Sequence, residues 1–279
     1  MSKEEGFVIA PSTSARLMIV VSKIIVRLDS KEHELKGYSW QVEPYRKLCE
    51  WGEIDGICKF EDINIIYDSD LQGIANLHER TDILILPHSL DPYVLRFAQD
   101  VLKEFLNNGG IIISLGALKG EPGETQQWLV ELGTGLAIHW CRIQRVRIPQ
   151  DARAAVFKSL WTGINIGATE CADLSRWDSS SHGYFVGKMP PNARVLAEGL
   201  YEREGRWYPI FVIKPWRTRE DLLSVLDDSS VGIICATTMD LDFHWDDAFT
   251  IRGGRPIALL LLRNLLNWAI HIVKQRRRG

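Results

Sequence analysis

Residues 231–249 read VGIICATTMDLDFHWDDAF, and after a short Gly-rich break the chain continues PIALLLLRNLLN as far as Asn267. The first part begins as a continuous apolar run, which is typical of a buried strand, and the second part is a strongly apolar helix. The strand delivers Asp240, Asp242, His244 and Asp246 to its C-terminal end. Carboxylates and a histidine at the end of a parallel strand lie where open α/β sheets bind ligands.

Four further apolar runs precede this stretch and alternate with helical patterns. The runs span 17–26, 62–67, 82–86 and 111–115, and the clearest helical spacing runs from Val94 to Leu106 and stops at Gly109-Gly110. Strands that are apolar throughout and separated by helices predict a mostly parallel sheet that is covered on both faces. From about 137 to 216 the pattern changes to irregular β segments, including a hairpin around Glu204-Gly205, which predict an antiparallel β insertion.

The composition is that of an ordinary globular protein. A length of 279 residues suits one large α/β domain, so we expect an N-terminal tail at 1–14, a single domain at 15–273 and a basic tail at 274–279. The net charge of −3 makes nucleic-acid binding unlikely. Five scattered cysteines without a CxxC, and a polar N-terminus, favour a cytoplasmic protein. The apolar run at 257–273 contains Arg263, Asn264, Asn267 and His271, so it predicts a core helix and no membrane span.

The order of these elements and two short motifs resemble the class I glutamine amidotransferase-like superfamily, especially its ThuA-like and beta-galactosidase-trimerisation-like branches. In that superfamily the last strand ends in a Phe-His-Pro-Glu motif, and the next helix often carries an Arg-Asn-Phe-Leu-like sequence. Here residues 243–246 (FHWD) and 263–266 (RNLL) occupy those places. The similarity covers residues 15–120 and 230–272. It implies a flavodoxin-like three-layer sandwich with a mostly parallel sheet.

The resemblance does not extend to all of the catalytic parts. The superfamily places a nucleophilic cysteine on a sharp turn after a strand, but here Gly116 falls near that position and the turn holds no cysteine. The oxyanion loop, which usually carries Gly-Gly, reads Pro87-His88-Ser89. His244 and Asp246 keep the places of the base and of the carboxylate that orients it. We therefore expect a catalytically degenerate member that is not a functional glutamine amidotransferase.

Two functions follow from this interpretation. The leading hypothesis is a non-catalytic module, a pseudoenzyme, that senses a ligand or assembles with a protein partner or with itself. It draws on tryptophans expected at the surface, namely Trp161, Trp177, Trp207 and Trp216. The alternative is a hydrolase that acts on a sugar or another small polar substrate, with His244 as base and Asp242 or Asp246 assisting. Convergence of the carboxylates and His88 in one concave pocket favours the enzyme, and a flat aromatic surface favours assembly.

Either function places the ligand at the C-terminal ends of the strands. The candidate catalytic residues are His244, Asp246 and Asp242, and the candidate ligand-binding residues are His88, Ser89, Ser114, Gly116, Asp240 and His182. Each has a structural alternative, such as capping a strand or holding an Asx turn. The negative charges of the aspartates repel an anion, so a neutral polar ligand or a cation fits this position better. The DxDxHxD pattern matches no known metal signature, so the sequence predicts neither a metal nor a cofactor.

Overall fold

The chain is described from a computed structural model, which covers residues 15–21, 39–88, 90, 92–115, 123–132, 134–164, 171–177, 179–242 and 256–279. The strands are β1 (Leu17–Val21), β2 (Asn64–Tyr67), β3 (Ile83–Leu86), β4 (Ile111–Ser114), β5 (Thr125–Gln126), β6 (Ala137–His139), β7 (Arg145–Arg147), β8 (Ala172–Asp173), β9 (Tyr184–Val186), β10 (Arg194–Tyr201), β11 (Arg206–Pro215) and β12 (Ile233–Thr237). The α-helices are α1 (Ser39–Glu50), α2 (Asp68–Leu71), α3 (Leu77–Arg80), α4 (Pro92–Phe97), α5 (Gln99–Asn107), α6 (Trp128–Glu131), α7 (Leu222–Val225) and α9 (Ile257–Arg276). Four short 3₁₀-helices, η2 (Phe60–Asp62), η3 (Asp151–Arg153), η4 (Ala155–Trp161) and η5 (Leu174–Trp177), complete the described elements.

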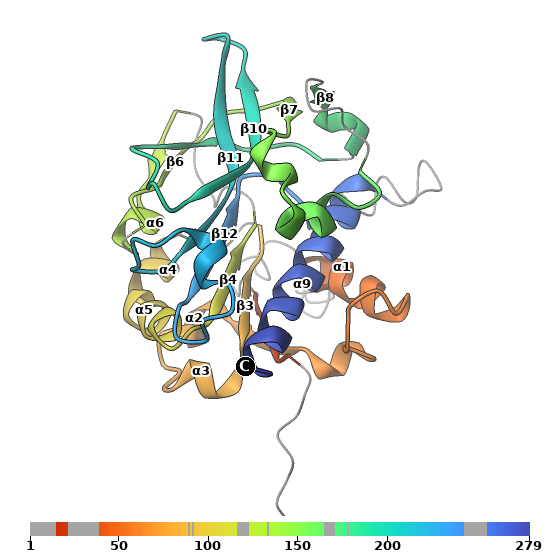
Figure 1. Cartoon of the computed structure of the whole chain (residues 1–279), viewed down its shortest axis with the longest axis vertical. Coiled ribbons are helices and arrows are strands. Elements are labelled where there is room, and N and C mark those ends of the chain that lie inside the picture. The colour runs from red at the N-terminus through yellow and green to blue at the C-terminus, as the bar shows by residue number, and fades with distance from the viewer. Residues whose placement is uncertain are drawn as a thin grey trace, which may run out of the picture.

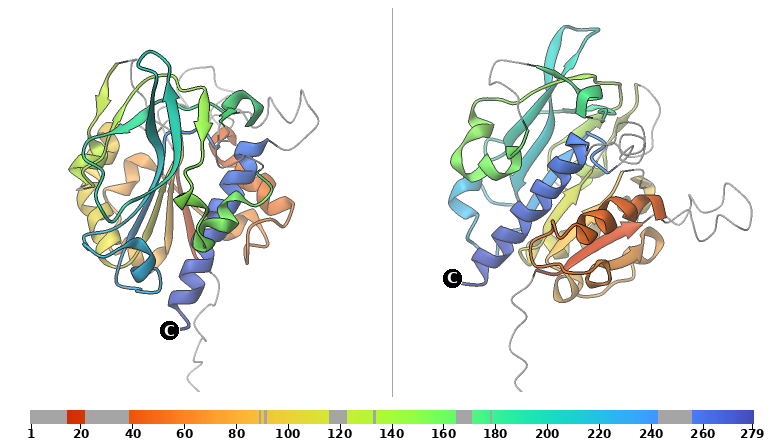
Figure 2. Two further views of the ribbon diagram at one scale, coloured as in Figure 1. Left: turned by 45° about the horizontal axis from the view of Figure 1, so that its top comes forward. Right: turned by 90° about the vertical axis from the view of Figure 1, so that its right-hand side faces the viewer.

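Five strands form the parallel half of the main sheet, in the order β2-β1-β3-β4-β12. Their residues alternate between two apolar clusters: in β4, Ile111 and Ile113 join the cluster that contains residues of α1 and α9, while Ile112 joins the cluster that contains residues of α5 and α6. Figures 1 and 2 show α1 and α9 on one face of the sheet and α2 to α6 on the other. Burial on both faces explains why β1, β3, β4 and β12 are largely apolar, whereas β2, at the edge of the sheet, is only partly buried.

The expected fold class, a flavodoxin-like sandwich with a mostly parallel sheet and a separate antiparallel insertion, is wrong. The main sheet has nine strands, and beyond β12 it continues as β11-β10-β7-β8, all antiparallel to their neighbours. Parallel and antiparallel pairings are therefore equal in number along this sheet, which makes it mixed. A second, three-stranded antiparallel sheet is formed by β5-β6-β9. The hairpin expected at Glu204-Gly205 is present, but β11 pairs directly with β12, so its strands extend the main sheet.

Helix α9 lies in the core, as the sequence predicts. Leu261 and Leu265 are fully buried and Trp268 is 4% exposed, whereas Leu260 is only partly buried. Two asparagines on α9 bind backbone of neighbouring segments: the Asn264 side-chain amide donates to the Leu160 and Thr162 carbonyls, and that of Asn267 donates to the Glu53 carbonyl. Among the described helices, α9 alone is long and apolar enough to cross a membrane, but 67% of its apolar window is buried inside the fold. Since Asn264 binds neighbouring backbone and Leu265 and Leu266 are buried, the RNLL motif at 263–266 serves to pack α9 in the core.

The end of the chain is also part of the fold. α9 continues to Arg276, whose guanidinium donates to the carbonyls of Gly109, Leu226 and Val231 at 2.8–2.9 Å. Burial lowers the pKa of Arg276 to about 10. Arg277 pairs with Asp82 at 2.8 Å. Two residues of the expected basic tail at 274–279 thus hold the last helix against the amino-terminal edge of β3 and the turns beside it.

Candidate functional site

Three parallel strands of the sheet end at the same level. The register pairs Leu86 of β3 with Ser114 of β4, and Ser114 with Ala236 of β12. His88 follows β3 by two residues, and Asp240 follows the end of β12 by three. Both side chains therefore leave the carboxyl edge of the sheet, where open α/β sheets bind their ligands.

A segment from the antiparallel part of the chain crosses the end of β12. Ser181 forms isolated bridges with Met239 and with Ile143. The backbone N–H of His182 donates to the Thr238 carbonyl at 3.0 Å, and the N–H of Asp240 donates to the Ser180 carbonyl at 3.0 Å. These bonds hold residues 180–182 against 238–240, and they place the His182 side chain over Asp240.

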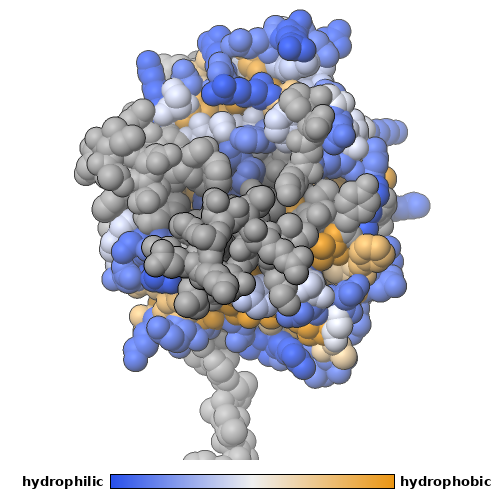
Figure 3. All heavy atoms as spheres, turned by 180° about the vertical axis from the view of Figure 1, so that it is seen from behind, coloured by the Kyte–Doolittle hydropathy of each residue, from blue (hydrophilic) through white to orange (hydrophobic). Residues whose placement is uncertain are grey.

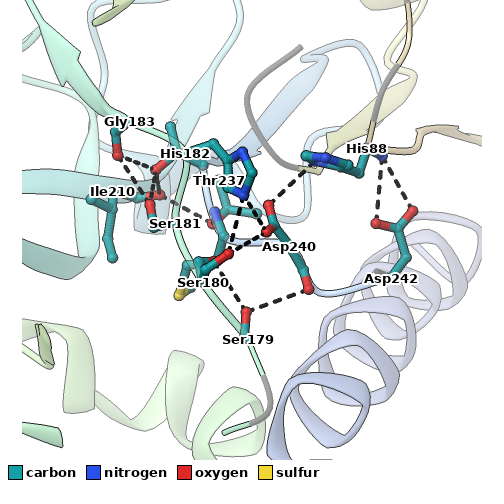
Figure 4. A network of polar contacts seen from close by, with 12 residues as sticks. His88, Ser179, Ser180, Ser181, His182, Gly183, Ile210, Thr237, Asp240 and Asp242 are labelled. Carbon is teal, nitrogen blue, oxygen red and sulfur yellow. Dashed lines mark hydrogen bonds and ion pairs between the residues drawn. The ribbon is translucent and has the colours of Figure 1, made fainter. Parts of the chain in front are cut away.

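Asp240 is the centre of the cluster (Figure 4). Its carboxylate is fully buried, and Oδ2 accepts a hydrogen bond from the Ser180 hydroxyl at 2.7 Å and lies 2.9 Å from His182 Nε2. Oδ1 lies 3.3 Å from His88 Nδ1, although the two atoms lack the alignment of a hydrogen bond. His88 is 6% exposed, whereas the side chain of His182 is 31% exposed. His182 is therefore the side of the cluster that faces solvent.

Asp242 lies next to this cluster but contacts different groups. The backbone N–H of His88 donates to both of its carboxylate oxygens at 3.3 and 3.4 Å, and the Tyr45 hydroxyl of α1 donates to Oδ2 at 3.4 Å. The pKa of Asp242 is raised to about 7, chiefly by burial and also by the negative charge of Asp240, while the hydrogen bond from His88 opposes the rise. Asp242 thus joins the ends of β3 and β12 to helix α1, which is a positioning role.

Ser180, His182 and Asp240 do not form a nucleophilic triad. In such a triad the serine and the carboxylate bind opposite nitrogens of the histidine ring. Here the Ser180 hydroxyl lies 3.1 Å from His182 Nε2, and that same nitrogen faces Asp240. Ser180 therefore orients the carboxylate and is not activated by the histidine.

Two cavities lie beside the cluster. The rings of Trp140 and His182 form a T-shaped pair with 5.7 Å between their centroids, and Trp140 also lines a cavity of about 420 Å³ together with Tyr201 and Arg203. Ser179 and Ser180 line a second cavity of about 200 Å³. Both cavities are lined by neighbours of the cluster, and neither is lined by His88, His182 or Asp240 themselves.

Of the residues that the sequence singles out, His88, His182 and Asp240 meet in the cluster, and Asp242 lies beside it. Ser114 is buried at the end of β4, between the strands that carry His88 and Asp240. His244, Asp246, Ser89 and Gly116 lie outside the described residues. Sequence reasoning missed Ser180, Tyr45 and Trp140. The SSSHG run at 179–183 was the available signal for Ser180, and nothing local marks the other two.

The described cysteines offer no activated thiol in this cluster. Cys235 is buried inside β12, and burial raises its pKa far above the ordinary value. Burial also raises the pKa values of Cys49 and Cys141 to about 11. A thiolate at these positions is disfavoured at neutral pH.

Comparison with known proteins finds no matching family profile and no matching curated protein. The chain is similar to three solved structures: a cytoplasmic protein from Salmonella typhimurium LT2 (11% identity, 81% of this chain and 85% of that one, TM-score 0.47), a cold-adapted beta-galactosidase from Rahnella sp. R3 (15%, 86% and 32%, 0.39) and the N-terminal domain of mmIFT52 (10%, 91% and 97%, 0.42). At these identities and TM-scores the similarities assign neither a family nor an activity, so membership of the amidotransferase-like superfamily stays a prediction.

Proposed function

We propose that this chain binds a small polar ligand at the carboxyl edge of its parallel strands and serves as a ligand-sensing module. The observation that carries this proposal is that two histidines from distant parts of the sequence, His88 and His182, both approach the buried carboxylate of Asp240. Burying a carboxylate is costly unless charge or hydrogen bonds compensate for it. Since Asp242 already ties the strand ends together, the fold does not need Asp240 for that purpose.

Assembly through an aromatic surface has less support. Trp177 and Trp216 are 2% and 5% exposed, so the expectation that they lie at the surface is wrong. Trp161 donates its indole N–H to the Ala152 carbonyl at 2.9 Å, and the Arg147 guanidinium covers the ring of Trp207. On the face seen in Figure 3, the hydrophobic residues among those described show between hydrophilic ones. Association with a protein partner or with a second copy remains a separate hypothesis.

The charge of the cluster limits the kind of ligand. A carboxylate at the centre repels phosphate and carboxylate groups, but it accepts hydrogen bonds from hydroxyl or amine groups. The two histidines add ring nitrogens that either donate or accept, according to the tautomer. A neutral polyhydroxyl compound such as a sugar, or a cation, is therefore the best match.

A hydrolase is the second candidate, and the contact between Asp240 and His182 favours it. If the Nε2–H of His182 donates to Asp240, the opposite ring nitrogen, Nδ1, is the basic one. A half-exposed imidazole that a buried carboxylate orients is suited to take a proton from water as the water attacks the substrate. In this version the base is His182, and not His244 as the sequence predicts.

A thermal-shift screen with matched variants tests the proposal. EDTA-treated protein is heated with neutral monosaccharides, polyols, nucleosides and amino acids at millimolar concentration. We expect at least one compound to raise the Tm of the wild type and to have no effect on Asp240→Asn and His182→Gln. His271→Gln, at an exposed position of α9, is the control and should behave as the wild type.

The same variants separate the two candidates. If a p-nitrophenyl glycoside or ester is hydrolysed by the wild type and by His271→Gln, but not by His182→Gln, the chain is an enzyme. A Tm rise that persists in both Asp240→Asn and His182→Gln would place the ligand elsewhere and overturn the proposal.

A further inference from the structure

We propose that His88, His182 and Asp240 together bind one divalent transition-metal ion. The three side chains offer two imidazole nitrogens and a carboxylate, and their ligand atoms all lie within 4.8 Å of one another. Two histidines and one carboxylate are a donor set that suits zinc, iron and related ions. The inference rests on the proposed binding site and goes against the expectation from the sequence that the chain holds no metal.

Two distances, one at each oxygen of the Asp240 carboxylate, are close to those between neighbouring ligands of one ion. Zinc lies about 2.0–2.1 Å from its nitrogen ligands, so neighbouring ligands of a tetrahedral site are about 3.3 Å apart. In the cluster, His88 Nδ1 lies 3.3 Å from Asp240 Oδ1, and His182 Nε2 lies 2.9 Å from Asp240 Oδ2. The two histidine rings lie 5.3 Å apart between centroids and are inclined at 76°, so they flank the carboxylate without stacking on each other (Figure 4).

The buried carboxylate supplies an independent observation. Asp240 is 0% exposed, and its Oδ1 accepts no hydrogen bond from any residue that the structure describes. Leaving a buried acceptor in this state destabilises the folded chain, and the cost is greater when the acceptor is charged. Oδ1 lies 3.3 Å from His88 Nδ1 without the alignment of a hydrogen bond, and two ligands of one metal ion can lie at the same distance. A cation bound at Oδ1 compensates the charge of the buried carboxylate.

The residues around the cluster behave as supports for metal ligands. The Ser180 hydroxyl donates to Oδ2 of Asp240 at 2.7 Å, and the carboxyl group of Asp242 holds the backbone N–H of His88. Hydrogen bonds of this kind, made by residues behind the ligands, orient the ligands of metal sites. Three protein ligands also leave at least one coordination position open, and the half-exposed His182 lies where a polar ligand would reach it.

Metal titration of tag-free protein tests the inference. The protein is stripped with EDTA, exchanged into chelator-free buffer and titrated with zinc by calorimetry and with cobalt by visible absorption. We expect one equivalent to bind, with cobalt bands that indicate nitrogen ligation. Asp240→Asn and His182→Gln should weaken binding by at least about 100-fold, and Ser180→Ala by about 10-fold, because it removes only a supporting hydrogen bond.

The controls keep every outcome informative. His139→Gln removes a half-buried histidine outside the cluster and should leave the affinity unchanged. Circular dichroism and melting curves establish that each variant is folded, and His182→Gln carries the test if Asp240→Asn does not fold. Absence of one-equivalent binding by the wild type, or equal affinity in wild type and His182→Gln, overturns the metal inference. The proposed function is tested separately: it still holds if a neutral compound raises the Tm of the EDTA-treated wild type and does not raise that of Asp240→Asn.

Discussion

Replacing Asp242 by asparagine should make the protein more stable at neutral and alkaline pH than the wild type. The pKa of Asp242 is about 7 in the folded chain, against an ordinary value of 3.8, a rise of about three units. Each unit corresponds to about 1.36 kcal/mol, so the ionised carboxylate costs the folded state about 4 kcal/mol. Asparagine keeps an oxygen that accepts hydrogen bonds from His88 and Tyr45, and it carries no charge.

The effect depends on pH in a fixed direction. Below the ordinary pKa, Asp242 is protonated in both the folded and the unfolded chain and contributes no pH dependence. Between about pH 4 and pH 7 the unfolded chain releases the proton while the folded chain keeps it, so the stability of the wild type falls as pH rises. Above about pH 7 both states are ionised and the full cost is present. The amide of the Asp242→Asn variant does not titrate, so the advantage of the variant should grow across this range.

Urea unfolding of both proteins in EDTA, at about pH 4.5, 6 and 8, measures this difference. Among the described residues, the groups that face Asp242 are Tyr45, Asp240 and, through its backbone, His88, and all three are present in both proteins. Tyr45 does not titrate in this range, because burial and Asp242 raise its pKa. If the asparagine amide itself destabilises the fold, it lowers the free energy of unfolding of the variant by the same amount at every pH. The test is therefore how the stability difference between the two proteins changes with pH. If the stability difference stays constant from acid to alkaline pH, the carboxyl group of Asp242 titrates normally and the reasoning is wrong.

Three further predictions concern the core, the C-terminus and the chemistry. Leu261→Ala should lower the free energy of unfolding by about 2–5 kcal/mol, because Leu261 is fully buried, and a loss under about 1 kcal/mol would mean that α9 is exposed. Arg276→Lys should lower the free energy of unfolding by about 2–4 kcal/mol, because lysine cannot reach three carbonyls at once. Arg278→Lys, at the exposed end, should change it little, and equal effects of the two substitutions would contradict the role of Arg276. Purified protein should release no ammonia from glutamine, and release that is abolished by replacing any one cysteine would refute this.

The parallel half of the sheet could be read from the sequence because each of its elements carries a local signal. Residues 83–86, 111–114 and 233–237 are apolar runs, and both faces of such strands are buried. Gly109, where the preceding helix ends, has a φ of +82° and packs so closely on Ser229 that a Cβ atom would lie 1.8 Å from its carbonyl oxygen. One helix between Val94 and Leu106 was expected, but the structure divides it at Ala98 into α4 and α5.

The antiparallel half could not be placed from the sequence, because a hairpin signal does not say which strand the hairpin joins. The pattern at 194–215 predicts two paired strands and a turn, and the structure has them. Their attachment depends on the pairing of Phe211 with Thr237 and of Pro215 with Ile233, which are contacts between distant parts of the chain. This attachment turns an expected insertion into a continuation of the main sheet, and it brings the segment at 179–183 to the end of β12.

Asp240 and Asp242 illustrate what the sequence alone could not separate. Both follow the same strand, both are almost fully buried, and two residues apart they look equivalent in the sequence. Asp242 faces the backbone of His88 and the hydroxyl group of Tyr45, which are structural partners. Asp240 faces two histidine rings, one of them reaching solvent. The difference arises because the chain between β8 and β9 folds over one of these carboxylates and not over the other, so the site depends on the antiparallel part of the fold as much as on the strand that carries the aspartates.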